Sequence, residues 1–73
     1  MFEWRPVDSE VITAEGFDPE TDTIYLRFKK DGSEWWYSEC PQHVWDQFTA
    51  PGQSRGAYLN KVLKLKPSGR HAP

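Results

Sequence analysis

The sequence predicts a small α+β domain in which a three-stranded antiparallel meander is followed by two short helices, in the order β-β-β-α-α. Residues 23–29 alternate strictly between apolar and polar side chains, which is typical of a half-buried strand. Asp31-Gly32 is a strong hairpin signal. Pro41 and Ser54 are residues that favour helix starts. A chain of 73 residues has room for one core.

The three strands are placed by their composition and by the turns between them. The first lies within residues 7–17, which contain a β-branched run and Gly16. Residues 18–22 form a turn, because proline presets φ and Asp side chains close such loops. The second and third strands are predicted at residues 23–29 and 34–39.

The hairpin turn determines which side chains share a face of the sheet. With Asp31-Gly32 as a two-residue loop, Phe28 lies opposite Trp35 and Leu26 lies opposite Tyr37. A four-residue loop preserves these faces, whereas a three-residue loop reverses them. The core is therefore expected to contain a set of large side chains: Leu26, Phe28, Trp35, Tyr37, Trp45 and Phe48.

The same register sends the neighbouring tryptophan to the other face. Trp36 is expected opposite Arg27 and beside Tyr25, on a face that stays exposed to solvent. Trp35 and Trp36 are thus predicted to have different roles.

The second half of the chain predicts two helices. The first covers residues 42–49 after Pro41, and the second covers residues 55–63 after the N-cap Ser54. Their apolar positions are Val44, Trp45 and Phe48, then Tyr58, Leu59, Val62 and Leu63. A short fourth strand near Leu65 is left open. We predict one domain over residues 1–66 and a frayed tail over residues 67–73.

Charge is distributed unevenly along the chain. Nine Lys and Arg against eleven Asp and Glu give a net charge of −2, which argues against a generally basic nucleic-acid-binding protein. All the acids precede residue 51, and the last 23 residues carry only basic groups. This asymmetry indicates either an acid-binding end or a solvated helix face with a disordered tail.

The cysteine content indicates the cellular compartment, and the reactive side chains indicate whether the chain can act as an enzyme or bind a metal. Cys40 is the only cysteine, which favours a reducing cytoplasm. We expect neither a signal peptide nor a membrane span. Cys40 and His43 lack a third orienting group, and no metal-ligand or phosphate-loop spacing is found. The sequence therefore predicts no enzyme, no metal and no cofactor, with Cys40 as a small buried side chain.

An ordered set of short motifs resembles the KTSC domain, a small module named for the C-terminus of some lysyl-tRNA synthetases. The motifs are Val7…Ser9…Ile12-x-Ala14-x-Gly16-Phe17-Asp18-Pro19, Thr23-Ile24-x-Leu26-x-Phe28, Gly32, Trp35-x-Tyr37 before Pro41, and Ser54-Arg55-Gly56-x-Tyr58-Leu59-Asn60-x-x-Leu63. Trp35 stands where the family usually has tyrosine, and the closing aromatic segment is absent. The resemblance implies an RNA-binding role but names no catalytic residue.

Two features of the sequence suggest binding surfaces. One is an aromatic and basic sheet face on which unpaired bases could stack, unless Phe2 or Trp4 covers it; it consists of Tyr25, Arg27, Lys29 and Trp36. Ser54-Arg55-Gly56 begins a helix and offers backbone N–H groups and an arginine to an anion, unless it is only an N-cap with a tightly packed glycine.

The predicted function is a non-catalytic, monomeric module that binds RNA or another single-stranded nucleic acid. The alternative is an accessory domain that uses the same aromatic patch to bind a protein partner. The candidate residues for either ligand are Tyr25, Arg27, Trp36, Ser54, Arg55, Gly56, Asn60, Lys61, Lys64 and Lys66.

Overall fold

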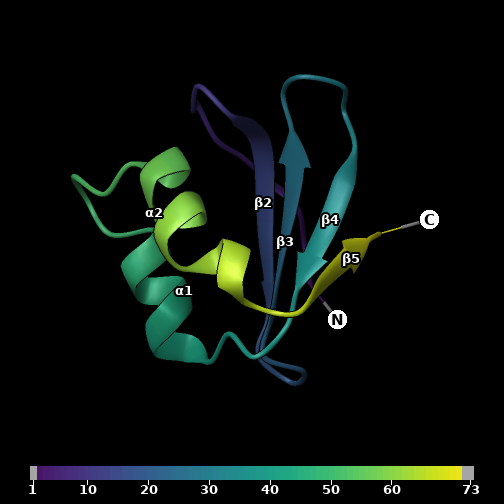
Figure 1. Cartoon of the computed structure of the whole chain (residues 1–73), viewed down its shortest axis with the longest axis vertical. Coiled ribbons are helices and arrows are strands. Elements are labelled where there is room, and N and C mark those ends of the chain that lie inside the picture. Colours follow the sequence, from purple (N-terminus) through teal and green to yellow (C-terminus); the bar gives the residue numbers. More distant parts are fainter. Residues whose placement is uncertain (1, 72–73) are drawn as a thin grey trace.

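A computed structural model describes residues 2–71, and it confirms an α+β fold with an antiparallel sheet and two helices (Figure 1). The five strands lie in the order β1-β2-β3-β4-β5, and both helices are inserted between β4 and β5. The elements are β1 (Arg5–Pro6), β2 (Ile12–Asp18), β3 (Thr23–Phe28), β4 (Glu34–Tyr37), α1 (Gln42–Phe48), α2 (Arg55–Lys61), the 3₁₀ turn η1 (Leu63–Leu65) and β5 (Ser68–Arg70).

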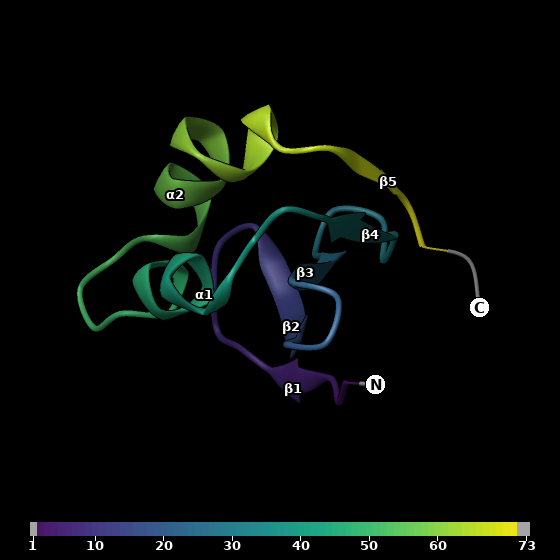
Figure 2. The same ribbon diagram turned by 90° about the horizontal axis from the view of Figure 1, so that it is seen from below.

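The two helices cover one face of the sheet, as the second view shows (Figure 2). The core lies between these layers, because each helix turns one apolar side toward β2 and β3. Its buried members are Ile12, Ile24, Leu26, Tyr37, Cys40, Val44, Phe48, Tyr58 and Leu63. Three predicted core residues, Phe28, Trp35 and Trp45, are only partly buried at its margin.

The hairpin between β3 and β4 corrects the predicted register by two residues. Leu26 pairs with Trp35 and Ile24 with Tyr37, so residues 29–32 form a four-residue loop. The backbone N–H of Ser33 donates to Asp31 Oδ1 at 3.0 Å, so it is not used for the tight two-residue turn. A shift of two preserves the faces, and Trp36 lies opposite Tyr25 rather than Arg27.

The C-terminal segment is part of the sheet, so the predicted frayed tail is wrong over residues 67–71. β5 pairs with β4, with Gly69 opposite Trp36. The N–H groups of Ser38 and His71 donate to Pro67 O and Glu34 O at 2.9 and 2.7 Å. The optional strand near Leu65 is instead η1, and the strand begins at Ser68. Residues 72 and 73 lie outside the described chain.

The helices begin close to where the sequence predicts and end earlier. Pro41 lies just before α1, and Ser54 Oγ accepts the Ala57 N–H at 3.3 Å as the N-cap of α2. α2 ends at Lys61, after which the chain tightens into η1. Within residues 2–71, no helix has the length and apolar character to cross a membrane.

Candidate functional site

The face predicted to be an exposed platform is covered by the N-terminal segment. The Phe2 ring stacks on Tyr25 with 3.8 Å between ring centres and 6° between planes. The Arg27 guanidinium lies 4.7 Å from the centre of the Trp4 ring and donates to Glu34 at 2.9 Å. These contacts occupy the surfaces on which a base would have stacked.

Trp36, the third member of that face, is covered by the C-terminal strand. A Cβ atom built on Gly69 would lie 2.5 Å from the Trp36 ring, so only glycine allows β5 to approach this closely. The His71 ring meets Tyr25 edge-on, with 5.0 Å between centres. Both ends of the described chain therefore fold over this face and leave Tyr25, Arg27 and Trp36 half-buried, so the platform is only partly open.

Arg55 is engaged by a buried carboxylate on the opposite, helix-covered face. Its Nε and Nη2 atoms donate to the two oxygens of Glu15 at 2.8 and 3.0 Å. Arg5 Nε donates to the same carboxylate at 2.9 Å, and the Glu15 side chain is 1% exposed. Burial raises the pKa of Glu15, but the bonds from Arg55 and Arg5 outweigh it and hold that pKa below its ordinary value.

The rest of the Ser54-Arg55-Gly56 motif also serves the fold. Ser54 caps α2, and a Cβ atom on Gly56 would make only an ordinary contact with a Val11 methyl group, at 3.4 Å. The Arg55 guanidinium is already bonded to Glu15, so it is not open to an anion in the way the sequence predicted.

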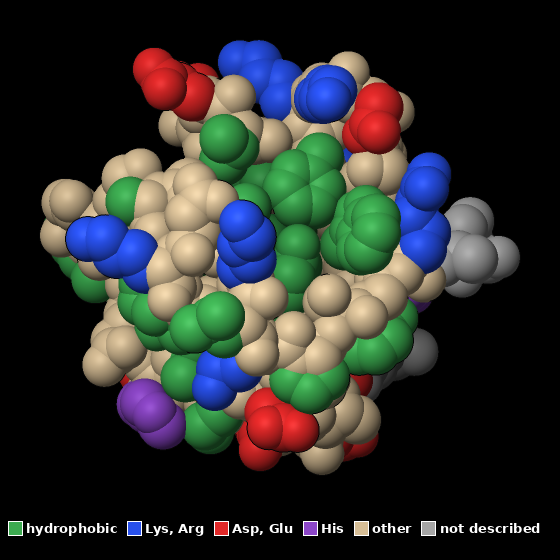
Figure 3. Space-filling model, in the orientation of Figure 1, with side chains coloured by type: hydrophobic (Ala, Val, Ile, Leu, Met, Phe, Trp, Pro, Cys, Tyr) green, Lys and Arg blue, Asp and Glu red, His purple; other side chains and the backbone are tan. Residues whose placement is uncertain are grey.

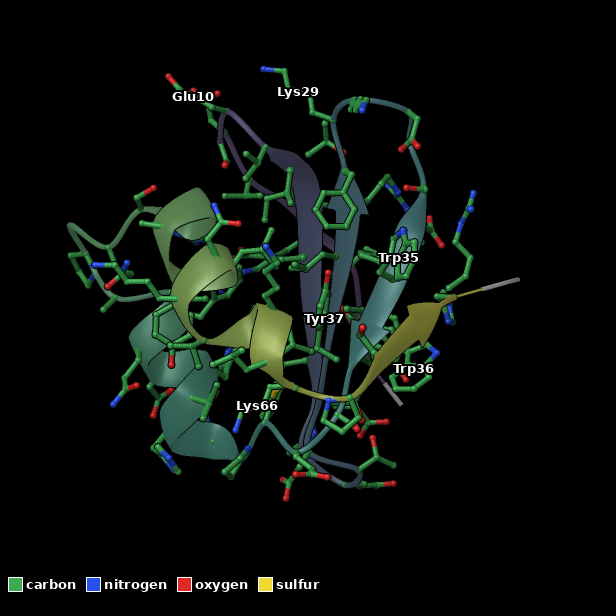
Figure 4. The ribbon with its side chains drawn as sticks, viewed as in Figure 1. Glu10, Lys29, Trp35, Trp36, Tyr37 and Lys66 are labelled. Carbon is green, nitrogen blue, oxygen red and sulfur yellow. The ribbon has the colours of Figure 1, made fainter. Side chains whose placement is uncertain are left out.

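A groove opens between α2 and the β3–β4 hairpin, with a volume of about 390 Å³. In the space-filling view it is a hollow floored by hydrophobic side chains, with basic side chains around it (Figure 3). Trp35 and Tyr37 point to the helix side of the sheet, whereas Trp36 lies beside β5 (Figure 4). The lining residues are Phe28, Lys30, Asp31, Ser33, Trp35, Tyr37, Leu59, Asn60, Lys64 and Ser68.

The groove lies beside α2, at the end of β3 and over β4, where the helices leave part of the sheet uncovered. Phe28 is the last residue of β3, and Trp35 lies in β4. Both are only partly buried and line the groove.

Positive charge lies around this aromatic floor. Lys30 and Lys64 line the groove, and the Arg70 guanidinium lies 6.0 Å from the centre of the Trp35 ring. A second hollow of about 360 Å³ adjoins the groove and is lined by Lys29, Lys30 and the acidic Glu10. The two hollows share four lining residues: Phe28, Lys30, Leu59 and Asn60.

Two of the ten candidate residues, Asn60 and Lys64, line the groove, and Gly56 lines the adjoining hollow. Lys61 is exposed on α2 without lining it, and Lys66 is half-buried near Cys40. Sequence reasoning placed Phe28, Trp35 and Tyr37 on the correct face and treated all three as core, which is confirmed for Tyr37 only, since Phe28 and Trp35 are partly buried. It missed Lys30, which belongs to the turn, and Arg70, because no pattern in the tail predicted a strand.

Cys40 does not have the surroundings of a reactive thiol. Its side chain is fully buried and its Sγ donates to Ser38 O at 3.3 Å. Burial raises the pKa of the thiol, which is opposite to the change that activates a nucleophile. Among residues 2–71, His, Cys, Asp and Glu side chains form no group of three that could hold a metal ion.

Comparison with known proteins identifies one family. The model of the KTSC domain matches residues 8–66. A protein of Tsukamurella paurometabola is 37% identical over 60 residues, which cover 82% of this chain and 87% of that protein. The crystal structure of a KTSC domain protein from Yersinia pestis matches 99% of this chain and all of its own, with a TM-score of 0.88 and 22% identity.

Proposed function

The chain belongs to the KTSC domain family, and we propose that it is a non-catalytic module that binds single-stranded RNA in the groove between α2 and the β3–β4 hairpin. The observation that carries this proposal is the partly open aromatic floor of Phe28 and Trp35 beneath a basic rim. Aromatic rings bind unpaired bases by stacking, and nearby cations attract the phosphates.

The charge distribution supports a nucleic acid despite the net charge of −2. Lys30, Lys64 and Arg70 lie at the groove, and Lys29 continues the basic rim along the adjoining hollow. Binding by phosphate neutralisation depends on the local charge at the contact surface rather than on the charge of the whole chain.

The Trp35-x-Tyr37 motif adds support from the geometry. Both side chains point from β4 to the helix side of the sheet, and both line the groove. Trp35 is only partly buried and is therefore at the ligand surface that we propose, whereas Tyr37 is buried in the core beneath it. The single, buried cysteine is consistent with a reducing, cytoplasmic setting, which is part of the proposal.

The two adjacent tryptophans provide a matched test. Fluorescence anisotropy with labelled single-stranded RNA should show that Trp35→Ala weakens binding by about 1–3 kcal/mol, the value of one lost stacking contact. Trp36→Ala removes the same side chain from the opposite, covered face and should retain wild-type affinity. Circular dichroism establishes that both variants are folded. Lys64→Glu adds a second variant at an exposed position, and it should weaken binding without affecting the core.

Three results would contradict the proposal. The first is the absence of saturable binding to any RNA at low salt, and the second is an equal loss of affinity in Trp36→Ala and Trp35→Ala. The third is affinity for a protein that depends on Trp35 and falls only weakly with salt. That result would favour the alternative function, since an aromatic protein contact lacks the steep salt dependence of phosphate binding.

A further inference from the structure

One acidic side chain lies in the otherwise aromatic and basic groove. Asp31 lines the groove together with Ser33 and Trp35. The Ser33 Oγ donates to Asp31 Oδ1 at 2.7 Å, and the Trp35 Nε1–H donates to the same Ser33 Oγ at 3.2 Å. This chain of hydrogen bonds holds the carboxylate beside the N–H edge of the indole ring.

The anchored carboxylate keeps part of its capacity to accept hydrogen bonds. Both described bonds, from the Ser33 N–H and Oγ, end on Oδ1, and a carboxylate has about four acceptor sites. The same bonds from Ser33 hold the pKa of Asp31 below its ordinary value. Asp31 is therefore ionised at neutral pH, and an ionised carboxylate accepts hydrogen bonds without donating any.

We propose, on the premise that the groove binds RNA, that Asp31 makes it selective for guanine. A base stacked on Trp35 would turn one edge toward the carboxylate, since Ser33 ties that carboxylate to the edge of the indole. The Watson–Crick edge of guanine presents two adjacent donors, N1–H and the N2 amino group, which can both donate to Oδ2, the oxygen on which neither Ser33 bond ends. Adenine and cytosine place an acceptor nitrogen beside their one amino group, and uracil places carbonyl oxygens beside its N3–H.

The test compares four labelled heptamers, UUUNUUU with N as G, A, C or U, by fluorescence anisotropy. The wild type should bind the guanine heptamer about tenfold more tightly than the uridine heptamer, as one well-formed pair of hydrogen bonds predicts. Asp31→Asn should reduce this preference to less than about twofold, because the amide replaces one acceptor by a donor. Asparagine retains an oxygen that can accept the Ser33 N–H, so the turn is kept.

Two controls separate guanine recognition by Asp31 from the effect of losing one negative charge and from any effect of the substitution on folding. Asp46→Asn removes the same charge from an exposed position on α1, outside the groove, and should keep the guanine preference. Inosine in place of guanine removes only the N2 amino group, and it should weaken binding to the wild-type protein by about three- to fivefold. The inosine measurement requires no change to the protein.

Each outcome decides between the two proposals. Equal binding of the four heptamers, or a guanine preference that survives Asp31→Asn, overturns the role of Asp31 and leaves RNA binding standing. If no heptamer binds at low salt, the proposed function is overturned and the guanine selectivity that rests on it falls too. A guanine preference lost in Asp31→Asn and kept in Asp46→Asn supports both.

Discussion

The two faces of the sheet carry similar side chains but differ in how far other segments of the chain cover them. One face bears Tyr25, Arg27 and Trp36, and the chain ends cover it through stacked rings and a close glycine contact. The other face bears Trp35 and Tyr37 beside α2, and part of it stays open as a groove. Alternation along a strand therefore assigns a residue to a face, whereas the neighbouring segments determine whether that face is available to a ligand.

The arginines on the two faces differ in the same way. Arg27 is partly exposed and pairs with a partly exposed Glu34, whereas Arg55 bonds through two atoms to the buried Glu15. An exposed ion pair contributes little to stability, but removing one partner of a buried pair leaves a charge without compensation. Arg55 therefore belongs to the fold, although its position in the sequence suggested a ligand contact.

The largest expected effect comes from breaking this buried pair. Arg55→Ala should lower the free energy of unfolding by about 3 kcal/mol, the lower end for a broken buried pair, because Glu15 would keep its burial and lose two of its hydrogen bonds while Arg5 remains bonded to it. Urea denaturation followed by tryptophan fluorescence measures this loss. Lys61→Ala, on the exposed side of the same helix, should stay within about 0.5 kcal/mol of the wild type. A loss below about 1 kcal/mol in Arg55→Ala would refute the structural role.

Acid should weaken the same interaction more gradually. The pKa of Glu15 in the folded protein lies below its ordinary value of 4.5, so its ionised form stabilises the fold above that pH. Stability should fall as the pH drops below this value and through the lower folded pKa. Unfolding measured from pH 7 to pH 3 tests this dependence.

Glu15→Gln is the control for the pH dependence. This substitution should reduce the dependence of unfolding stability on pH but not remove it. The pKa of Asp31 is also lowered, by its bonds from Ser33, so Asp31 contributes to the same dependence. An unchanged slope in Glu15→Gln would show that another group causes the acid sensitivity.

A smaller effect is expected from reopening the covered face. Gly16 lies opposite Tyr25, and a Cβ atom there would run into the Phe2 ring and lie 3.1 Å from the Glu3 carbonyl oxygen. Gly16→Ala should therefore cost about 1–3 kcal/mol and displace the N-terminal segment. Urea unfolding and the NMR signals of the Tyr25 ring measure the two effects.

The clash itself is tested by a double-mutant cycle. In a Phe2→Ala background, Gly16→Ala should cost less, because the ring that it meets has been removed. Equal costs in both backgrounds would show that Phe2 does not lie against Gly16. RNA binding in the groove should be retained in Gly16→Ala, since the groove is on the other face.

The smallest predicted effect concerns the rim of the groove. Lys64→Ala should reduce the slope of log affinity against log salt concentration by about 0.7, the value for one phosphate contact on a single strand. Anisotropy titrations at several salt concentrations measure the slope. Lys61→Ala is the matched control, because Lys61 is exposed on α2 but does not line the groove. Equal changes in both variants would indicate general attraction rather than a defined site.

Local patterns predicted much of the fold. The alternation of residues 23–29 and the parity of the hairpin assigned Trp35 and Trp36 to opposite faces, and a register error of two did not change that assignment. Ser54 predicted its own N-cap, because capping depends on neighbours within one turn. The helix ends and β5 were predicted poorly, since β5 is stabilised by pairing with a strand about 30 residues earlier.

The candidate site was predicted less well than the fold. Asn60 and Lys64 line the groove, but Tyr25, Arg27 and Trp36 are on the other face, which the chain ends partly cover. The sequence predicted a ring-and-cation surface on that face, whereas the function that we propose uses the helix side of the sheet. No local signal in the sequence pairs Glu15 with Arg55, because the two residues are 40 positions apart.

The sequence by itself determined the α+β class, the face of each strand residue and the starts of both helices, because these depend on periodicity and on contacts within a few residues. Only the tertiary structure decided which aromatic face is covered and which arginine is buried. Those outcomes depend on where the N-terminal segment, the short helices and β5 come to rest against the sheet. Such long-range contacts leave little trace in local pattern, so the open groove could be recognised only in the folded chain.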